Sequence, residues 1–234
     1  MKSIVVINGS PKKESNSLVL AVRLCNSVKH GASPINIVVH QLSQENIKQC
    51  TGCMTCCKTG LCPIDDEMKT IRHDLKHANL VIMSSPVHFG TVSSVFQNFV
   101  ERSLIDLHTF EYWGKPVVNI LSTNGSGEDD ADKYLTRIGL LFGMKKIGMA
   151  FISTNDAFRE RDFNTLIGKV IKSMTLDKRK PSLTNRLYFE SMKSIIKKNP
   201  GYFEHESKVW RKRGWLDKSY RKIKEEINLT TTST

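Results

Sequence analysis

The chain has 234 residues, 39% of them hydrophobic and 25% charged, and a formal net charge of +12. The hydrophobic and charged fractions are ordinary for a folded soluble protein, and the length suffices for one large domain and an appendage. The longest apolar runs hold only four or five residues, which excludes a helix that spans a membrane.

The chain begins with MKSIVVINGSPKK, a short apolar run that leads directly into a turn. It has neither the apolar core of a signal peptide nor a small-residue cleavage site, so we predict a first strand and a cytoplasmic protein. Because disulfides seldom persist in the cytosol, a cysteine cluster in this chain is expected to bind metal or to be redox-active.

Five short β-rich runs recur along the first two thirds of the chain. They are Ser3–Asn8, Ile35–His40, Asn79–Ser84, Pro116–Thr123 and Ile147–Thr154. Each is continuously apolar and does not alternate, as is typical of strands covered on both faces in a parallel sheet.

Helical patterns separate these strands. They cover residues 16–30, 65–78, 91–104, 130–142 and 162–174, and the second opens with the acidic run Asp65, Asp66 and Glu67. Strands that alternate with helices indicate βαβ units. We therefore predict a flavodoxin-like three-layer α/β/α sandwich with a five-stranded parallel sheet in the order 2-1-3-4-5.

The character of the chain changes after Asp177, where helical patterns continue without another strand. We divide the chain into a domain at residues 1–176 and a helical, basic extension at residues 177–234. Residues 176–234 carry 15 Lys and Arg against 7 Asp and Glu. A basic tail suits nucleic acid or an anionic membrane, but here the cations alternate with aromatic residues at helical spacing, which favours a solvated helical arm.

In an open parallel sheet, ligands bind at the carboxyl ends of the strands where the winding reverses, between strands 1 and 3 in this order. The loop after strand 1, residues 8–17, offers glycine, hydroxyl groups, an amide and a helix N-terminus, which suit a phosphate. It matches neither the GxxxxGK[ST] nor the GxGxxG motif. The alternative is a plain helix cap, with Ser15 or Asn16 acting only locally.

The loops after strands 3 and 4 extend the predicted site. Residues 84–91, SSPVHFGT, combine a rigid proline, a β-branched residue, an aromatic ring and a glycine, and a planar apolar ligand would rest on such a backbone. His88 is a contact or, as the weaker alternative, a catalytic base. Residues 122–127, STNGSG, form a polar rim on the same side.

Five of the six cysteines lie between Cys50 and Cys62, with the spacing C-x2-C-x2-C-x5-C followed by Pro63. This spacing approximates the ferredoxin pattern for a [4Fe–4S] cluster, although the last gap is longer. A zinc site, empty thiols in a packed loop and a thiol switch at the vicinal Cys56 and Cys57 are the alternatives. Cys25, on the apolar face of the first helix, is interpreted as core packing.

Four segments together resemble one group of proteins. GSPKKESNS resembles the phosphate loop of flavodoxin-like NADPH-dependent FMN reductases, and SSPVHFGTVSSVFQNFVERS resembles their second flavin loop. CTGCMTCCKTGLCPIDDEM resembles the cysteine segment of the iron–sulfur flavoprotein branch, and KVWRKRGWLDKSY resembles the ending of many members with an extended C-terminus. The resemblance covers residues 1 to about 155 and the tail.

The resemblance implies FMN as cofactor, with Lys12 standing where the group often has Arg. It places the FMN phosphate on Ser10, Lys12, Ser15, Asn16 and Ser17, the isoalloxazine on Pro86, Val87, His88, Phe89 and Gly90, and its pyrimidine side near Asn124, Gly125 and Ser126. It also implies a [4Fe–4S] cluster on Cys50, Cys53, Cys56 and Cys62, with Cys57 as a spare.

The first hypothesis is therefore an FMN-dependent enzyme that takes electrons from NAD(P)H to a quinone, nitro or azo compound, or to a protein acceptor. No catalytic side chain is required, because FMN itself accepts the hydride. The second is an iron–sulfur flavoprotein that carries electrons to or from ferredoxin without binding nicotinamide. We expect no nucleic-acid partner, and a homodimer or homotetramer in which the aromatic C-terminal extension covers a partner's flavin edge.

Overall fold

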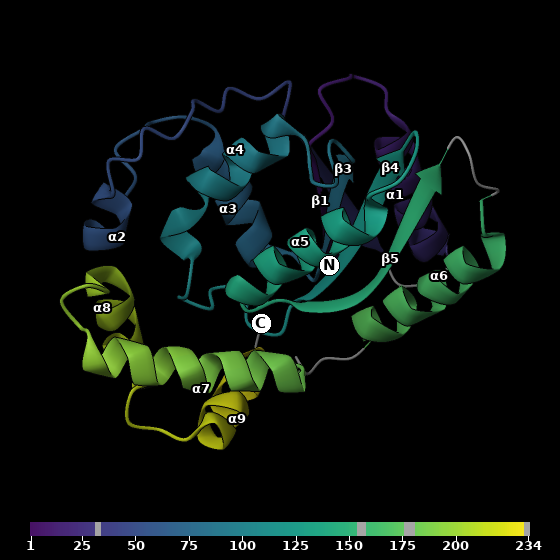
Figure 1. Cartoon of the computed structure of the whole chain (residues 1–234). Helices are drawn as coiled ribbons and strands as arrows, with labels where there is room; N and C mark the ends of the chain where they lie inside the picture. Colours follow the sequence, from purple (N-terminus) through teal and green to yellow (C-terminus); the bar gives the residue numbers. More distant parts are fainter. Residues whose placement is uncertain (31–33, 154–157, 176–180, 232–234) are drawn as a thin grey trace.

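One five-stranded, all-parallel sheet forms the centre of the protein, as the computed structural model shows for the described residues 1–30, 34–153, 158–175 and 181–231. Its strands are β1 (Lys2–Asn8), β2 (Ile35–Gln41), β3 (Leu80–Pro86), β4 (Pro116–Thr123) and β5 (Lys145–Ser153). The strand order is β2-β1-β3-β4-β5, which confirms the predicted flavodoxin-like sheet (Figure 1). The predicted end of the fifth strand at Thr154 lies outside the described residues.

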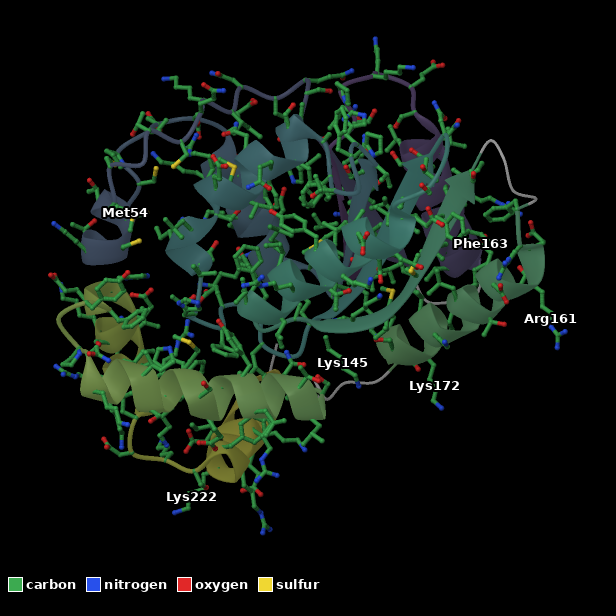
Figure 2. The ribbon with its side chains drawn as sticks, in the orientation of Figure 1. Met54, Lys145, Arg161, Phe163, Lys172 and Lys222 are labelled. Atoms are coloured by element: carbon green, nitrogen blue, oxygen red, sulfur yellow. The ribbon has the colours of Figure 1, made fainter. Side chains whose placement is uncertain are left out.

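Helices cover both faces of the sheet. Val5 and Ile7 of β1 face a core shared with α3 (Met68–His77), α4 (Ser94–Arg102) and α5 (Glu128–Leu141). Ile4 and Val6 face a second core with α1 (Asn16–His30) and α6 (Glu160–Thr175). Figure 2 shows Phe163 of α6 turned toward the sheet, whereas Arg161 and Lys172 point away from it. Burial on both faces explains why the strand segments are apolar without alternation.

Two helices begin later than the sequence pattern predicts, because polar side chains stop them from extending backward. The backbone N–H of Met68 donates to Asp66 Oδ1 over 3.1 Å at the start of α3. Ser93 Oγ accepts from the N–H of Phe96 and caps α4. The structure also contains two short helices that were not predicted, α2 (Thr55–Thr59) and the 3-10 helix η1 (Leu104–Asp106).

The C-terminal extension consists of α7 (Leu183–Lys198), α8 (Glu204–Lys212) and α9 (Tyr220–Thr231). Together they lie below the sheet domain in Figure 1, with α8 beside α2. The boundary predicted between residues 176 and 177 falls outside the described residues, so the division into two units stays a prediction.

The aromatic residues of the extension pack within this chain. Trp210 is fully buried and stacks on Phe189 with ring centroids 4.6 Å apart. The same cluster holds Trp215 together with Phe110 and Trp113, which precede β4. The expectation that these aromatics cover a partner subunit therefore does not hold for the two tryptophans. The physical reason is that the segment after η1 supplies an apolar surface of its own.

His40, near the end of β2, lies between two carboxylates. Its Nδ1 is 2.8 Å from Glu45 Oε1, and its Nε2 is 3.1 Å from Asp74 Oδ2. Burial lowers the pKa of His40, but the hydrogen bonds and charges of Glu45 and Asp74 outweigh it, so the pKa is raised above its ordinary value. The imidazolium thereby ties β2 to α3.

We predict a pH-dependent loss of stability in the His40→Gln variant. A raised pKa in the folded state means that this stabilisation is fully present below the unfolded pKa of about 6.5 and is lost as the pH rises through the folded pKa. The variant should lower the free energy of unfolding by about 1.5–3 kcal/mol near pH 6, since two hydrogen bonds between charged groups are lost.

Urea denaturation from about pH 6 to 9 measures this difference between the variant and the original protein, which should shrink as the pH rises. His77→Gln is the matched control, because His77 is exposed and its ring pairs with the backbone carbonyl of His73 over 2.8 Å and not with a carboxylate. A difference that is the same at every pH would contradict the prediction.

Candidate functional site

The loops that leave the carboxyl ends of β1, β3 and β4 meet at one cavity of about 250 Å³. Eight of its lining residues were predicted from the sequence, namely Ser10, Lys12, Ser15, Asn16, Pro86, Val87, His88 and Asn124. Pro11, Glu14, Ser122 and Thr123 complete the lining; they belong to the predicted loops but were not named as individual cofactor contacts. The cavity lies where the winding of the sheet reverses, as expected for a ligand site in this fold.

Five predicted residues do not line this cavity, namely Ser17, Phe89, Gly90, Gly125 and Ser126. Ser17 is buried behind the loop, and its Oγ is 3.3 Å from Ser15 Oγ. Phe89 is fully exposed. Gly90 instead packs against the loop after β4, where a Cβ on Gly127 would come within 2.9 Å of Gly90 Cα.

One end of the cavity suits an anion. Lys12 brings a positive charge, Ser10 and Ser15 bring hydroxyl groups, and α1 begins at Asn16 with its N-terminus at the cavity. Glu14 also lines the cavity and offsets part of the Lys12 charge. Ser15 Oγ accepts from the N–H of Leu18 over 3.3 Å, so Ser15 is also the cap of α1.

Gln41 anchors the loop after β1 through side-chain hydrogen bonds, a role that sequence reasoning missed. Its Nε2 donates to the carbonyl oxygens of Ser10 and Lys12 over 3.1 and 2.9 Å. Its Oε1 accepts from Asn8 Nδ2 over 2.5 Å. Gln41 is the last residue of β2, the strand next to β1, and this position is the one signal that the sequence offered.

Gly9 lets this loop approach α4 closely. A Cβ on Gly9 would lie 2.5 Å from Phe96 Cβ, well inside van der Waals contact. The N–H of Gly9 donates to the carbonyl of Ser84 over 2.8 Å, and Ser93 Oγ donates to the Gly9 carbonyl. The loop is therefore fixed to β3 and to α4 before any ligand binds.

The loop after β3 ends in a tight turn beside the cavity. His88 and Thr91 exchange two backbone hydrogen bonds of 2.8 and 3.0 Å. The two residues between them, Phe89 and Gly90, have φ angles of 51° and 72°. Positive φ at both central positions is the pattern of a type I′ turn, which normally takes Asn or Asp followed by Gly.

The cysteine segment follows β2 but lies apart from the cavity. In Figure 1, α2 stands beside α8 on the left, well away from the loop after β1, and Figure 2 places the exposed Met54 in this segment. Cys53 is exposed, and hydrogen bonds from Thr55 lower the pKa of its thiol. Burial raises the pKa of the Cys57 thiol to about 12.

Arg102, at the end of α4, holds the base of the cysteine segment. Its Nη1 donates to the carbonyl of Lys48 over 2.6 Å and to Asp66 Oδ2 over 2.5 Å. Its Nη2 lies 3.8 Å from Cys62 Sγ. Both side chains of the Arg102–Asp66 ion pair are 1% exposed, so the pair is sealed from solvent. The two ends of the segment are thus fastened to the same helix.

The chemistry of the cavity fits FMN. Hydroxyl groups, a cation and a helix N-terminus stand at one end for a phosphate, and Pro86 and Val87 provide an apolar seat at the other. In the cysteine segment, the Cys56 thiol lies close enough to Cys50, Cys57 and Cys62 to interact with them electrostatically. No three His, Cys, Asp or Glu side chains among the described residues are grouped to hold a metal ion.

Comparison with known proteins found a matching family model and several relatives. A family model described as NADPH-dependent FMN reductase matches residues 2–158. An iron–sulfur flavoprotein from Methanocaldococcus jannaschii is 31% identical over 100 residues, which are 43% of this chain and 51% of that protein. The aligned part thus spans about half the length of this relative. An iron–sulfur flavoprotein from Clostridioides difficile is 25% identical over 201 residues, 83% of this chain and 89% of that protein.

Among solved structures, an FMN-dependent NADH-azoreductase from Bacillus anthracis in complex with FMN superposes with a TM-score of 0.56. The match covers 75% of this chain and 98% of the azoreductase at 16% identity, so it shows a shared fold alone. In the part of this chain that the structure describes, no helix combines the length and apolar character needed to cross a membrane.

We predict that Gln41→Met weakens FMN binding about tenfold. The variant removes two hydrogen bonds to the loop carbonyls, and a tenfold change in affinity corresponds to about 1.4 kcal/mol, within the range for one or two such bonds. Quenching of FMN fluorescence during titration measures the affinity. Gln44→Met is the matched control, because the Gln44 side chain is exposed. Equal affinities of the two variants would show that Gln41 does not support the loop.

Proposed function

The chain belongs to the NADPH-dependent FMN reductase family, and on this premise we propose that it passes electrons from NAD(P)H through FMN to an acceptor. The acceptor is a quinone, nitro or azo compound, or a protein. The cavity at the carboxyl ends of β1, β3 and β4 is the observation that carries this proposal, since its polar and apolar ends match the two ends of FMN. The family, by its description, consists of NADPH-dependent FMN reductases.

The residues of this chain bind and orient the cofactor. Lys12, Ser10 and Ser15 receive the phosphate at the N-terminus of α1, with Ser17 buried behind them. Gln41 keeps the loop carbonyls turned away from the anion, because its amide holds two of them. Pro86, Val87 and His88 seat the ring, and Asn124 contacts its polar edge. FMN, when bound, supplies a ring that accepts a hydride and releases electrons.

No side chain has to act as an acid or base in this proposal. His88 lines the cavity, and we assign it to contact with the ring or the second substrate. Gly90, Gly125 and Ser126 keep a supporting role, since they shape the turns at the edge of the cavity and do not line it.

Mixing the purified protein with NADPH without oxygen tests the enzyme proposal. Protein loaded with FMN should lose its visible flavin absorbance when the flavin is reduced. Lys12→Gln should lower the affinity for FMN and make this affinity less sensitive to salt concentration, because one charge contact to the phosphate is lost. Protein that retains no FMN after incubation with an excess of it would overturn the proposal.

A second candidate function is electron transfer to or from ferredoxin without nicotinamide. The spacing of Cys50, Cys53, Cys56 and Cys62 favours it, and two relatives bear the name iron–sulfur flavoprotein. In the same anaerobic experiment, reduced ferredoxin would bleach the flavin and NADPH would not. Under either proposal we expect a homodimer or homotetramer. Analytical ultracentrifugation, which measures the mass of the protein in solution, tests this expectation.

The cluster is a separate proposal, because no three potential ligands among the described residues are grouped to hold a metal ion and the thiols would have to move closer together to bind one. We predict about four iron and four sulfide per chain after anaerobic purification. Cys62→Ser should lose most of this iron, whereas Cys57→Ser, the matched control from the same segment, should keep it. Wild-type protein that binds FMN but holds neither iron nor sulfide would reject the cluster and leave the FMN enzyme intact.

A further inference from the structure

We propose that Phe89 is a specificity-determining residue that binds the flat conjugated ring of the second substrate at the mouth of the cavity. This inference rests on the proposed function, because it concerns the molecule that exchanges electrons with bound FMN. It assigns Phe89 a role different from that implied by the sequence resemblance, which placed this residue in the flavin seat.

The backbone at Phe89 adopts a conformation that its own side chain disfavours. With φ at 51° it lies in the left-handed region, where a bulky residue is an outlier and Asn or Gly is usual. Gly90, at φ 72°, is the residue that a type I′ turn prefers at its position, but Phe89 is not. Strain of this kind persists where the surrounding structure imposes it, and it is frequent at ligand sites.

The surroundings of the turn do impose it. The reciprocal hydrogen bonds between His88 and Thr91 close the turn on one side. On the other side, Gly127 packs so tightly that its missing Cβ would lie within 3.4 Å of Gly90 and of the Val87 side chain. The N–H of Val87 donates to the carbonyl of Ser122 over 2.7 Å. The turn is therefore fixed between β3 and the loop after β4.

The side chain of Phe89 gains no stabilising packing that would offset this strain. It is fully exposed, so it contributes no buried apolar surface to stability. Among the large exposed apolar side chains of the described residues, Phe89 alone directly follows a residue that lines the cavity. An aromatic residue that is both strained and unburied is explained by a partner that is present only part of the time.

The size and polarity of the cavity indicate which partner that is. Its volume of about 250 Å³ lies just below the usual range for ligand sites of about 300–1,000 Å³. A cavity of this size, with the phosphate of FMN on Lys12 and Ser10, would leave part of the cofactor accessible from solvent. The ring of bound FMN would then lie at the end formed by Pro86, Val87 and His88, the residues that directly precede Phe89 in the chain. A second ring that reached bound FMN from solvent at this end would pass the exposed Phe89 side chain, and paired aromatic rings attract each other.

The test compares Phe89→Asn and Phe89→Trp in protein loaded with FMN. Asn suits the turn, so Phe89→Asn should raise the melting temperature by about 2–4 °C. Its KM for a ring-shaped acceptor, a naphthoquinone, should rise about threefold to tenfold relative to the KM for ferricyanide, which has no ring. Phe89→Trp should restore the naphthoquinone KM. A parallel rise in the KM for NADPH would identify nicotinamide as the ring.

Tyr202→Asn is the matched control, because Tyr202 is an exposed aromatic residue far along the chain in the extension. It should change neither KM. An unchanged KM ratio in Phe89→Asn would overturn the inference. So would a tenfold loss of FMN affinity, which would return Phe89 to the flavin seat, or a change in elution volume on gel filtration, which would make it an interface between copies. Wild-type protein that binds no FMN would instead overturn the proposed function.

Discussion

The pairing of β1 with β3 is the constraint on which the candidate site depends. These strands are 72 residues apart from the end of one to the start of the other, and their register aligns Asn8 with Ser84 at the carboxyl edge of the sheet. Ser84 Oγ donates to Asn8 Oδ1 in a fully buried contact, and the N–H of Gly9 donates to the Ser84 carbonyl. Since unpaired polar groups in such a position are costly, this register is strongly favoured. This register places the loop after β1 beside the loop after β3 at the cavity.

Helix α4 connects this cavity to the cysteine segment. At its N-terminus, Ser93 caps the helix and bonds to Gly9 of the loop after β1. At its C-terminus, Arg102 bonds to Asp66 and lies beside Cys62. The nine residues of α4 span about 13 Å at 1.5 Å per residue. The two places where the sequence concentrates its unusual residues are thus fastened to opposite ends of one rigid element.

The C-terminal extension reaches the cysteine segment from the other side. Helix α8 contacts α2, and a Cβ on Gly60 would overlap the ring of His205. The extension is itself anchored by Trp210, whose Nε1 donates to the His108 carbonyl over 2.9 Å. The cysteine segment is therefore contacted by the sheet domain and by the extension, although it stays largely exposed and its own short helix has no buried residue.

The sequence by itself determined the five strands, their order, most of the helices and eight of the residues around the cavity. It could do so because apolar runs, glycine turns and helix caps are local signals, and the topology rule for parallel sheets then places their loops. Gln41 and the packing of Trp210 were decided only by tertiary structure, because each acts through contacts with segments distant in the chain. The same reason explains Phe89, whose strained turn depends on how closely Gly127 approaches from the next strand.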